Sequence, residues 1–337
     1  MKLTLNISRF RVLITTLLAG FLFLLPQFLY AQDSTVIEEV EEPVKARPVK
    51  NTFQSVWIID NQTVLVPIKK TFEMDIQHRF GTVENGYEDF FGFFAPSNIR
   101  IGFSYVPINK LNVGIGFTKT TAAIIPEQAP SSVNGPLWDA SLKYSIVTQT
   151  KGVYPVSVSY YVNAAYNTKK DKEKEIYRNY SDRITYFHQL LIARKVTDKL
   201  SIQVAPSISH QNVANGYFIQ LNDTTAKVKS DMKFDHFAVA VSARYKLTDV
   251  TSVMVSYDQP ISKHVSNNPN PNISFGLEFN TSSHSFQVFV TNYFYLVPQI
   301  NNLYNTNSPF KYTDAAGNKI EGGKFLIGFN ITRLWNY

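Results

Sequence analysis

The residues best suited to chemistry are charged side chains that recur at every second position of several segments. In TFEMDIQHRF (71–80), Glu73, Asp75 and Arg79 alternate with apolar side chains. Side chains of a strand point alternately to its two faces, so these charges would line one side of a sheet. The full candidate set for an interior face is Glu73, Asp75, Arg79, Arg100, Asp139, Lys143, Arg244, Asp258 and Glu278. Two interpretations fit the mixed signs: salt bridges that stiffen a wall, or a lining that selects a small polar solute.

Signatures of catalysis and of metal binding are weak. The 6 histidines are scattered, and none has the His-Glu-x-x-His spacing of a zinc hydrolase. His210 lies near Ser207 and Ser209 and could be interpreted as the base of a hydrolase, but no third group that would orient it is identifiable. We therefore predict no catalytic residue, no metal site and no cofactor, and we predict that the protein is not an enzyme.

Composition excludes further classes of protein. The chain has no cysteine, which excludes disulfides, thiolate metal sites, a cysteine nucleophile and a lipid anchor on cysteine. The net charge of +7 would suit an acidic partner, but the basic residues form no helix face or stripe, so we predict no nucleic-acid partner. Charged residues make up 18% of the chain and mean hydropathy is −0.13, which is too polar for a helical membrane protein.

The elements that would position the charges are strands with one apolar and one polar face. NIRIGFSYV, KLNVGIGFTK and WDASLKYSI repeat the pattern of 71–80. Further segments lie at 153–166, 183–196, 199–210, 234–247, 250–258, 273–280, 284–295 and 324–337. The segment at 183–196 alternates poorly. This gives roughly twelve strands, an even number, as single-chain outer-membrane barrels require.

The connections between these segments alternate in length. Tight turns are expected at 107–110, 148–152, 196–199, 247–250 and 281–284, and long connections at 81–97, 121–135, 167–182, 211–233, 259–272 and 296–323. One end of the sheet would then carry turns and the other end loops, which is typical of a membrane barrel and unusual for a soluble one. We predict an all-β fold, an antiparallel up-and-down transmembrane β-barrel in the cell outer membrane, with both termini in the periplasm.

The final segment, FLIGFNITRLWNY, is predicted to close the barrel. Every backbone group in hydrocarbon needs a protein partner, so the last strand must pair with the first. The residues predicted to face lipid or the aromatic girdle are Phe325, Ile327, Phe329, Ile331, Trp335 and Tyr337. Arg333 on the same face is tolerable only near the interface, where its side chain can reach water.

The N-terminal part divides into three segments. Residues 1–31 carry Lys2, Arg9 and Arg11, then an apolar core that ends at Ala31, and are expected to be a cleaved signal peptide. Residues 32–50 are expected to be a flexible periplasmic linker. Residues 51–70 have two interpretations: a hairpin that plugs the lumen, or a periplasmic extension or extra strand pair. The barrel itself is predicted to span 71–337.

Several stretches resemble one known family. NTF at 51–53, HRFG at 78–81, FFGF, NIRIGFSYVPINKLNVGIGFTK and WDASLKYSIV are similar to the bacterial integral-membrane β-barrel family catalogued as domain of unknown function 5777. The resemblance covers about 50–337 and implies the fold and the location. It implies no functional residue, because none is established for that family.

Function is expected to follow from the interior of the barrel. The leading hypothesis is a porin-like channel or an uptake barrel for a small polar solute. The alternatives are a structural or partner-binding barrel without conductance, in which 32–70 binds a periplasmic protein, and an outer-membrane hydrolase. Expected partners are outer-membrane lipid and lipopolysaccharide, which the charge run KKDKEKE (169–175) could contact, and the barrel-assembly machinery.

Overall fold

The computed structural model describes most of the chain from Arg47 onward. The described residues are 47–119, 135–174, 176–214, 216–222, 225–265, 268–313, 317 and 319–336. The predictions for the signal peptide, for most of the linker and for Tyr337 concern residues outside this set.

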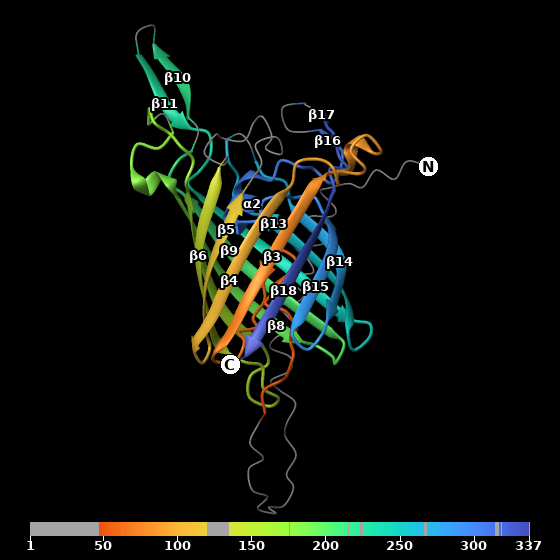
Figure 1. The fold of residues 1–337 in the computed structure, drawn as a ribbon. Coiled ribbons are helices and arrows are strands. Elements are labelled where there is room, and N and C mark those ends of the chain that lie inside the picture. The colour runs from red at the N-terminus through yellow and green to blue at the C-terminus, as the bar shows by residue number, and fades with distance from the viewer. Residues whose placement is uncertain are drawn as a thin grey trace, which may run out of the picture. The chain divides into compact units, whose positions relative to one another are not determined.

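Twelve antiparallel strands form a closed barrel (Figure 1). The wall strands are β3 (Thr71–Thr82), β4 (Asn98–Ile108), β5 (Leu111–Lys119), β6 (Pro136–Val147), β7 (Ser157–Asn167), β8 (Ile184–Lys195), β9 (Leu200–Gln211), β12 (Asp235–Lys246), β13 (Thr251–Pro260), β14 (Asn272–Asn280), β15 (His284–Thr291) and β18 (Leu326–Asn336). The last strand pairs with the first, with Ile331 opposite Ile76 and Trp335 opposite Phe72. This confirms the predicted fold and the closure by the C-terminal strand.

The wall strands present polar side chains to the interior and apolar side chains to the outside. On β3, burial alternates along the whole strand, and the buried positions include Asp75, Gln77 and Arg79. On β4, the outward side chains Ile99 and Phe103 are 42% and 41% exposed. A soluble barrel would bury these apolar side chains, so the inverted arrangement needs hydrocarbon around it. The wall therefore spans a membrane.

Short and long connections alternate around the barrel, as predicted. The turns comprise 109–110, 148–156, 196–199, 247–250 and 281–283, and we call this side the turn end; the opposite side is the loop end. The largest differences from the predicted boundaries occur at two places. The connection after β6 is longer than the expected turn at 148–152. The strand expected at 284–295 ends at Thr291, because Tyr293 and Leu296 turn away from the wall and are buried.

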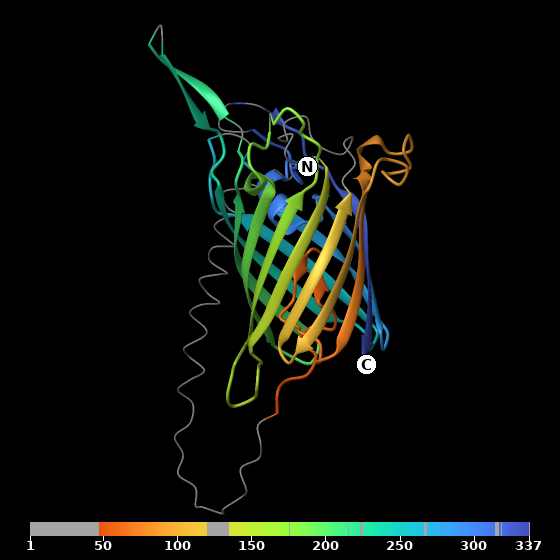
Figure 2. The same ribbon diagram turned by 60° about the vertical axis from the view of Figure 1, so that its left-hand side comes forward.

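Several elements lie outside the wall. The short strands β1 (Trp57–Ile58) and β2 (Asn61–Gln62) form an antiparallel hairpin inside the barrel, visible through the wall in Figure 2. The other elements belong to the loop-end connections: η1 (Val83–Asn85), η4 (Tyr180–Arg183), the hairpin of β10 (Gly216–Asn222) and β11 (Thr225–Ser230), helix α2 (Pro298–Tyr304), and the strand pair β16 (Tyr312–Thr313) and β17 (Lys319–Ile320). Within the described residues, no helix is long and apolar enough to cross a membrane.

The seam between β18 and β3 carries aromatic contacts on its outer face. The rings of Phe72 and Trp335 lie 5.6 Å apart, and the guanidinium of Arg333 lies 4.8 Å from the ring of Trp335. Ile327, Phe329 and Ile331 alternate with the buried inward positions of β18, whereas Phe325 precedes the strand and its carbonyl accepts a hydrogen bond from the backbone N–H of Val83. Arg333 sits near the turn end, so its charge is close to the interface.

We expect Ile115→Arg to lower the free energy of unfolding by about 2–4 kcal/mol, because a guanidinium is poorly solvated at the middle of the hydrocarbon. Ile115 lies at the middle of β5, opposite Phe103, and is 50% exposed. The matched control is Val250→Arg in the turn between β12 and β13, where the cost falls to about 0–1 kcal/mol. Urea titration of the vesicle-inserted protein measures both. Equal costs would contradict a lipid-facing position for Ile115.

Candidate functional site in the barrel interior

All of the charged residues predicted to face the interior are buried there. Glu73, Asp75, Arg79, Arg100, Asp139, Lys143, Arg244, Asp258 and Glu278 are each at most 6% exposed. The structure brings them together in separate groups. Asp75, Arg100 and Asp139 form one ion-pair cluster, and Arg244 and Glu278 form another. Lys143 and Asp258 instead contact the hairpin inside the barrel.

The first ion-pair cluster joins β3, β4 and β6, and its arginine binds one of the two carboxylates through two hydrogen bonds. Arg100 Nη2 and Nε donate to the two carboxylate oxygens of Asp139 at 2.8 and 3.0 Å, and Nη1 donates to Asp75 Oδ1 at 2.8 Å. Asn163 donates to Asp139 at 3.0 Å, and Gln77 donates to Asp75 at 3.0 Å. A buried guanidinium needs this many partners, because each unpaired charge would carry a large desolvation cost.

Two glycines make room for this cluster. Gly102 on β4 and Gly116 on β5 lie directly opposite each other in the register. A methyl group at either position would collide with the guanidinium of Arg100. A glycine inside a strand often marks such a close approach. These two glycines therefore indicate, in the sequence, where a large side chain lies against the wall, which the alternation of charges does not.

Arg244 and Arg79 are held differently from Arg100. Arg244 Nε donates to Glu278 at 3.0 Å, and Arg244 also bonds Gln54 of the N-terminal segment. The guanidinium of Arg79 lies 4.5 Å from the ring of Phe289, and Nη1 donates to the side chain of Asn330 at 3.0 Å. Arg100 and Arg244 are therefore paired with carboxylates and present little free charge to the interior, whereas Nε and Nη2 of Arg79 have no hydrogen-bond partner among the described residues.

Residues 53–65, which we call the inner hairpin, occupy the space within the wall. The chain enters from the turn end, where Val49 N–H donates to the carbonyl of Gln149 at 2.7 Å. Phe53, Ile58 and Ile59 are each at most 2% exposed and belong to one apolar cluster with wall residues such as Met254. Of the two interpretations of 51–70, the structure shows a hairpin inside the lumen.

Two wall glutamines hold the backbone of the inner hairpin. Gln287 on β15 donates to the carbonyl of Trp57 at 2.8 Å and accepts from the N–H of Ile59 at 3.2 Å. Gln203 on β9 donates to the carbonyl of Gln62 at 2.7 Å and accepts from the N–H of Val64 at 3.1 Å. Each strand of the hairpin thus has its outer edge satisfied by one side-chain amide.

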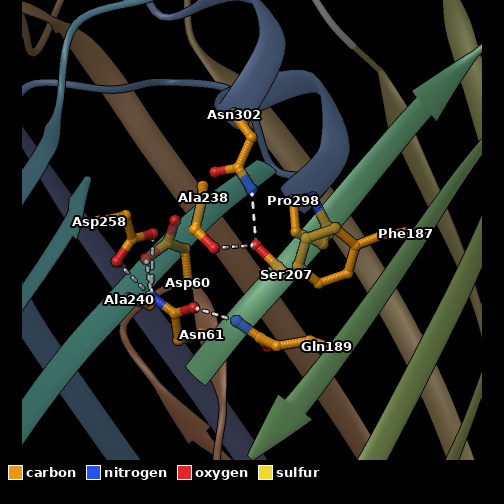
Figure 3. A pocket seen from close by; sticks show the side chains of 10 residues that line it. All are labelled: Asp60, Asn61, Phe187, Gln189, Ser207, Ala238, Ala240, Asp258, Pro298 and Asn302. Carbon is orange, nitrogen blue, oxygen red and sulfur yellow. Dashed lines mark hydrogen bonds between the residues drawn. The ribbon is translucent and has the colours of Figure 1, made fainter. Parts of the chain in front are cut away.

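Side chains of the hairpin tip bind the wall as well. The amide of Asn61 donates to both carboxylate oxygens of Asp258, at 3.0 and 3.1 Å, and to Ser256 at 3.1 Å. Gln189 donates to the Asn61 oxygen at 3.1 Å. Lys143 Nζ donates to Gln62 at 2.8 Å. Figure 3 shows Asn61 between Gln189 and Asp258.

The connection between β15 and β18 closes the interior from the loop end. Asp60 at the hairpin tip accepts a 2.5 Å hydrogen bond from the hydroxyl of Tyr293, which follows β15. The amide of Asn301 in α2 donates to Asp60 at 3.4 Å, and that of Asn302 donates to Ser207 of the wall at 3.4 Å. Burial raises the pKa of Tyr293, so the phenol stays protonated and can donate to Asp60.

The junction of hairpin, α2 and wall is tightly filled. The gap drawn in Figure 3, between Asp60, Asn302 and wall residues including Phe187, does not admit a water molecule. A second gap, beside Trp57 and Lys143, has a volume of about 20 Å³, enough for about one water. Neither of these two gaps offers a passage of solute size.

Most of the residues that hold the inner hairpin carry no charge and were not among the predicted interior residues. Besides the predicted Lys143 and Asp258, the residues that hold it include amides and a hydroxyl: Gln189, Gln203, Gln287, Asn330 and Ser159. Alternation places them inward but does not distinguish them from other polar wall residues. The segment YFYLVPQINNLY (293–304) carried a clearer signal, because it is too apolar for a loop that stays in solvent.

The structure separates the residues of the hydrolase hypothesis. Ser207 and Ser209 are buried on the inner face of β9, while His210 points outward and bonds Asp235 at 2.7 Å. A strand sends neighbouring side chains to opposite faces, so this serine and histidine pairing does not form. Among the described residues, no group of three or more His, Cys, Asp or Glu is arranged to hold a metal ion.

Comparison with known proteins yields one family match. The model of a membrane-bound beta barrel domain (DUF5777) matches residues 53–335. None of the curated proteins matches. Among solved structures, the chain is similar to the NanC porin (10% identity, 79% of this chain and 99% of that chain, TM-score 0.42). It is also similar to the KdgM porin in complex with disordered oligogalacturonate (9%, 79% and 99%, 0.41) and to an outer membrane channel from Pseudomonas putida F1 (9%, 80% and 97%, 0.39).

We expect Arg100→Gln to lower the free energy of unfolding by about 3–5 kcal/mol, because Asp75 and Asp139 would remain buried without a cationic partner. The combined change Asp75→Asn, Arg100→Met and Asp139→Asn leaves no unpaired charge in the cluster and should recover most of the loss. Urea titration in vesicles measures both variants. A combined variant as unstable as Arg100→Gln would show that the cluster stabilises the wall by geometry rather than by charge pairing.

Proposed function

The chain belongs to the family of membrane-bound beta barrel domains (DUF5777), and we propose that it is a gated channel for a small polar solute, closed at rest by the inner hairpin. We place the barrel in the outer membrane of a Gram-negative bacterium, exported by residues 1–31. The turn end faces the periplasm and the loop end faces lipopolysaccharide. The asymmetry of the connections and the apolar outer wall support this placement.

The polar attachment of the inner hairpin carries the proposal. Its backbone and its tip are bonded to Gln203, Gln287, Asn330 and Asp258 of the wall. Water can replace hydrogen bonds of this kind at little net cost, so the wall would remain stable and hydrated after the hairpin leaves. An interior that was apolar throughout could not be hydrated in this way.

The closed state is nevertheless the stable one. Phe53, Ile58 and Ile59 are buried against the wall, and their exposure to water would oppose opening. Because the chain enters the barrel at the turn end, the hairpin can leave only toward that end. Opening also requires Asp60 to separate from Tyr293. A periplasmic partner that bound the preceding residues 32–50 could supply the necessary free energy.

A second candidate function is a barrel that never conducts. The bonds from Asp60 to Tyr293 and Asn301 favour it, because they join the hairpin to the loop-end connection and close the interior from both ends. In this case the interior would stabilise the wall, and the exposed loops would bind a partner.

We expect the double variant Asp60→Ala, Asn61→Ala to open far more often than the wild-type protein in single-channel recordings. The two substitutions remove the bonds of the hairpin tip to Tyr293 and Asp258. The matched control is Ser274→Ala, an inward-facing residue of β14 whose hydroxyl makes no hydrogen bond within the described residues. This control should keep the wild-type opening frequency.

A crosslink tests whether the hairpin is the gate. The chain has no cysteine, so a variant with Asn61→Cys and Ser256→Cys reacts with a short bis-methanethiosulfonate only at this pair, whose native side chains lie 3.1 Å apart. The crosslinked channel should be silent, and a reductant should restore its openings. If neither this variant nor the double alanine variant conducts, the second candidate function is favoured.

A further inference from the structure

We propose that the wall residues that hold the inner hairpin form a binding site for an extended peptide, and that the hairpin occupies this site in the closed state. The inference rests on the proposed function, because it names the class of solute that would enter once the hairpin leaves. The ligand is recognised by its backbone, and the site lies on the inner faces of β6, β7, β9, β15 and β18.

The two glutamines bind the peptide backbone in the same pattern. Gln287 bonds the carbonyl of Trp57 and the N–H of Ile59, and Gln203 bonds the carbonyl of Gln62 and the N–H of Val64. In both cases the amide spans the carbonyl of one residue and the N–H two residues later. These groups lie on the same edge of an extended chain, and one residue of a neighbouring parallel strand would bond the same pair.

Further wall groups extend each contact along the backbone. Asn330 donates to the carbonyl of Ile59 at 2.6 Å, next to the contact made by Gln287. Ser159 donates to the carbonyl of Val64 at 2.8 Å, next to that made by Gln203, and Lys143 Nζ donates to the carbonyl of Thr63 at 3.2 Å. The wall thus offers donors and acceptors at the intervals that a peptide backbone requires.

Contacts of this kind do not depend on side-chain identity. Binding domains that add a peptide strand to a sheet edge gain affinity from the main chain in the same way. Gln203 and Gln287 are each 1% exposed, so their amides would be costly to leave unpaired in a closed interior. At each glutamine, an extended segment of a second peptide can form the same pair of bonds, whereas an oligosaccharide has no alternation of amide N–H and carbonyl groups.

The side chains beside the backbone indicate which peptides fit. Ile58, Ile59 and Val64 lie in an apolar cluster that includes Phe187, Leu191, Met254 and Phe289 of the wall. Of the positively charged groups nearby, Arg100 is already paired with Asp75 and Asp139, whereas Lys143 donates to the hairpin itself. We therefore expect the site to prefer extended peptides with apolar side chains over strongly charged ones.

The test uses the full chain carrying Asp60→Ala and Asn61→Ala, which weakens the hairpin tip without changing the wall glutamines. Fluorescence anisotropy in detergent measures binding of a labelled peptide with the sequence FQSVWIIDNQTVLV and of a scrambled peptide of the same composition. We expect both to bind with affinities within about tenfold of each other, because the contacts are to the backbone. A linear oligosaccharide of similar length should not compete.

Adding Gln203→Leu and Gln287→Leu should weaken peptide binding by about tenfold or more, because each glutamine supplies two hydrogen bonds. The direction of the change is diagnostic. The same substitutions also release the native hairpin. If the glutamines served only to retain the hairpin, their loss would make the lumen more accessible and would raise peptide binding. N-methylation of the peptide at the positions of Ile59 and Val64 removes the donors and should weaken binding similarly.

Unchanged or stronger binding in the glutamine variant, or full binding of the N-methylated peptide, overturns the proposal. If the leucine variant does not fold, a variant with Gln203→Glu and Gln287→Glu replaces it. Glutamate keeps the size of the glutamine side chain and removes its N–H donors. Single-channel recording separates the two proposals. If the barrel opens but the peptide does not block the current, the peptide site is refuted and the channel is not. If the peptide binds to a barrel that never opens, the channel is refuted and the peptide site is not.

Discussion

The structure depends on the need to satisfy every backbone N–H and C=O group away from water. In the wall this need is met by closure, with β18 paired to β3 so that no strand edge meets hydrocarbon. Inside the barrel the same need arises for the two-stranded inner hairpin, whose outer edges have no neighbouring strand. There the side-chain amides of Gln203 and Gln287 take the place of a strand. The backbone groups of the wall are therefore satisfied by other strands, and those at the outer edges of the hairpin by side-chain amides.

The interior also shows why a charged lining is not by itself a selectivity filter. Arg100 and Arg244 are bound to carboxylates one or two strands away, so their charges serve to hold strands of the wall together. The groups that remain for a ligand are mostly neutral amides. This division between ion pairs within the wall and amides toward the centre is the basis of the function proposed for the lumen.

The fold could be predicted from sequence because it rests on local periodicity. Alternation along 71–80 assigns Glu73 and Asp75 to the interior, and the lengths of the connections assign the two ends of the barrel. The content of the lumen could not be predicted in this way. Whether 51–70 enters the barrel depends on contacts such as that of Ile59 with Gln287, which are separated by more than two hundred residues. The pairing of Asp60 with Tyr293 is equally distant in the chain.

The route of the chain has a consequence for the order of assembly. The inner hairpin is made before any wall strand, yet its contacts come from strands as late as β15 and β18. Its full set of native bonds can therefore form only when the C-terminal strand is in place, so a segment that is synthesised early reaches its final contacts last. Until then, the amides of Gln287 and Asn330 lack the partners that the hairpin gives them in the finished molecule.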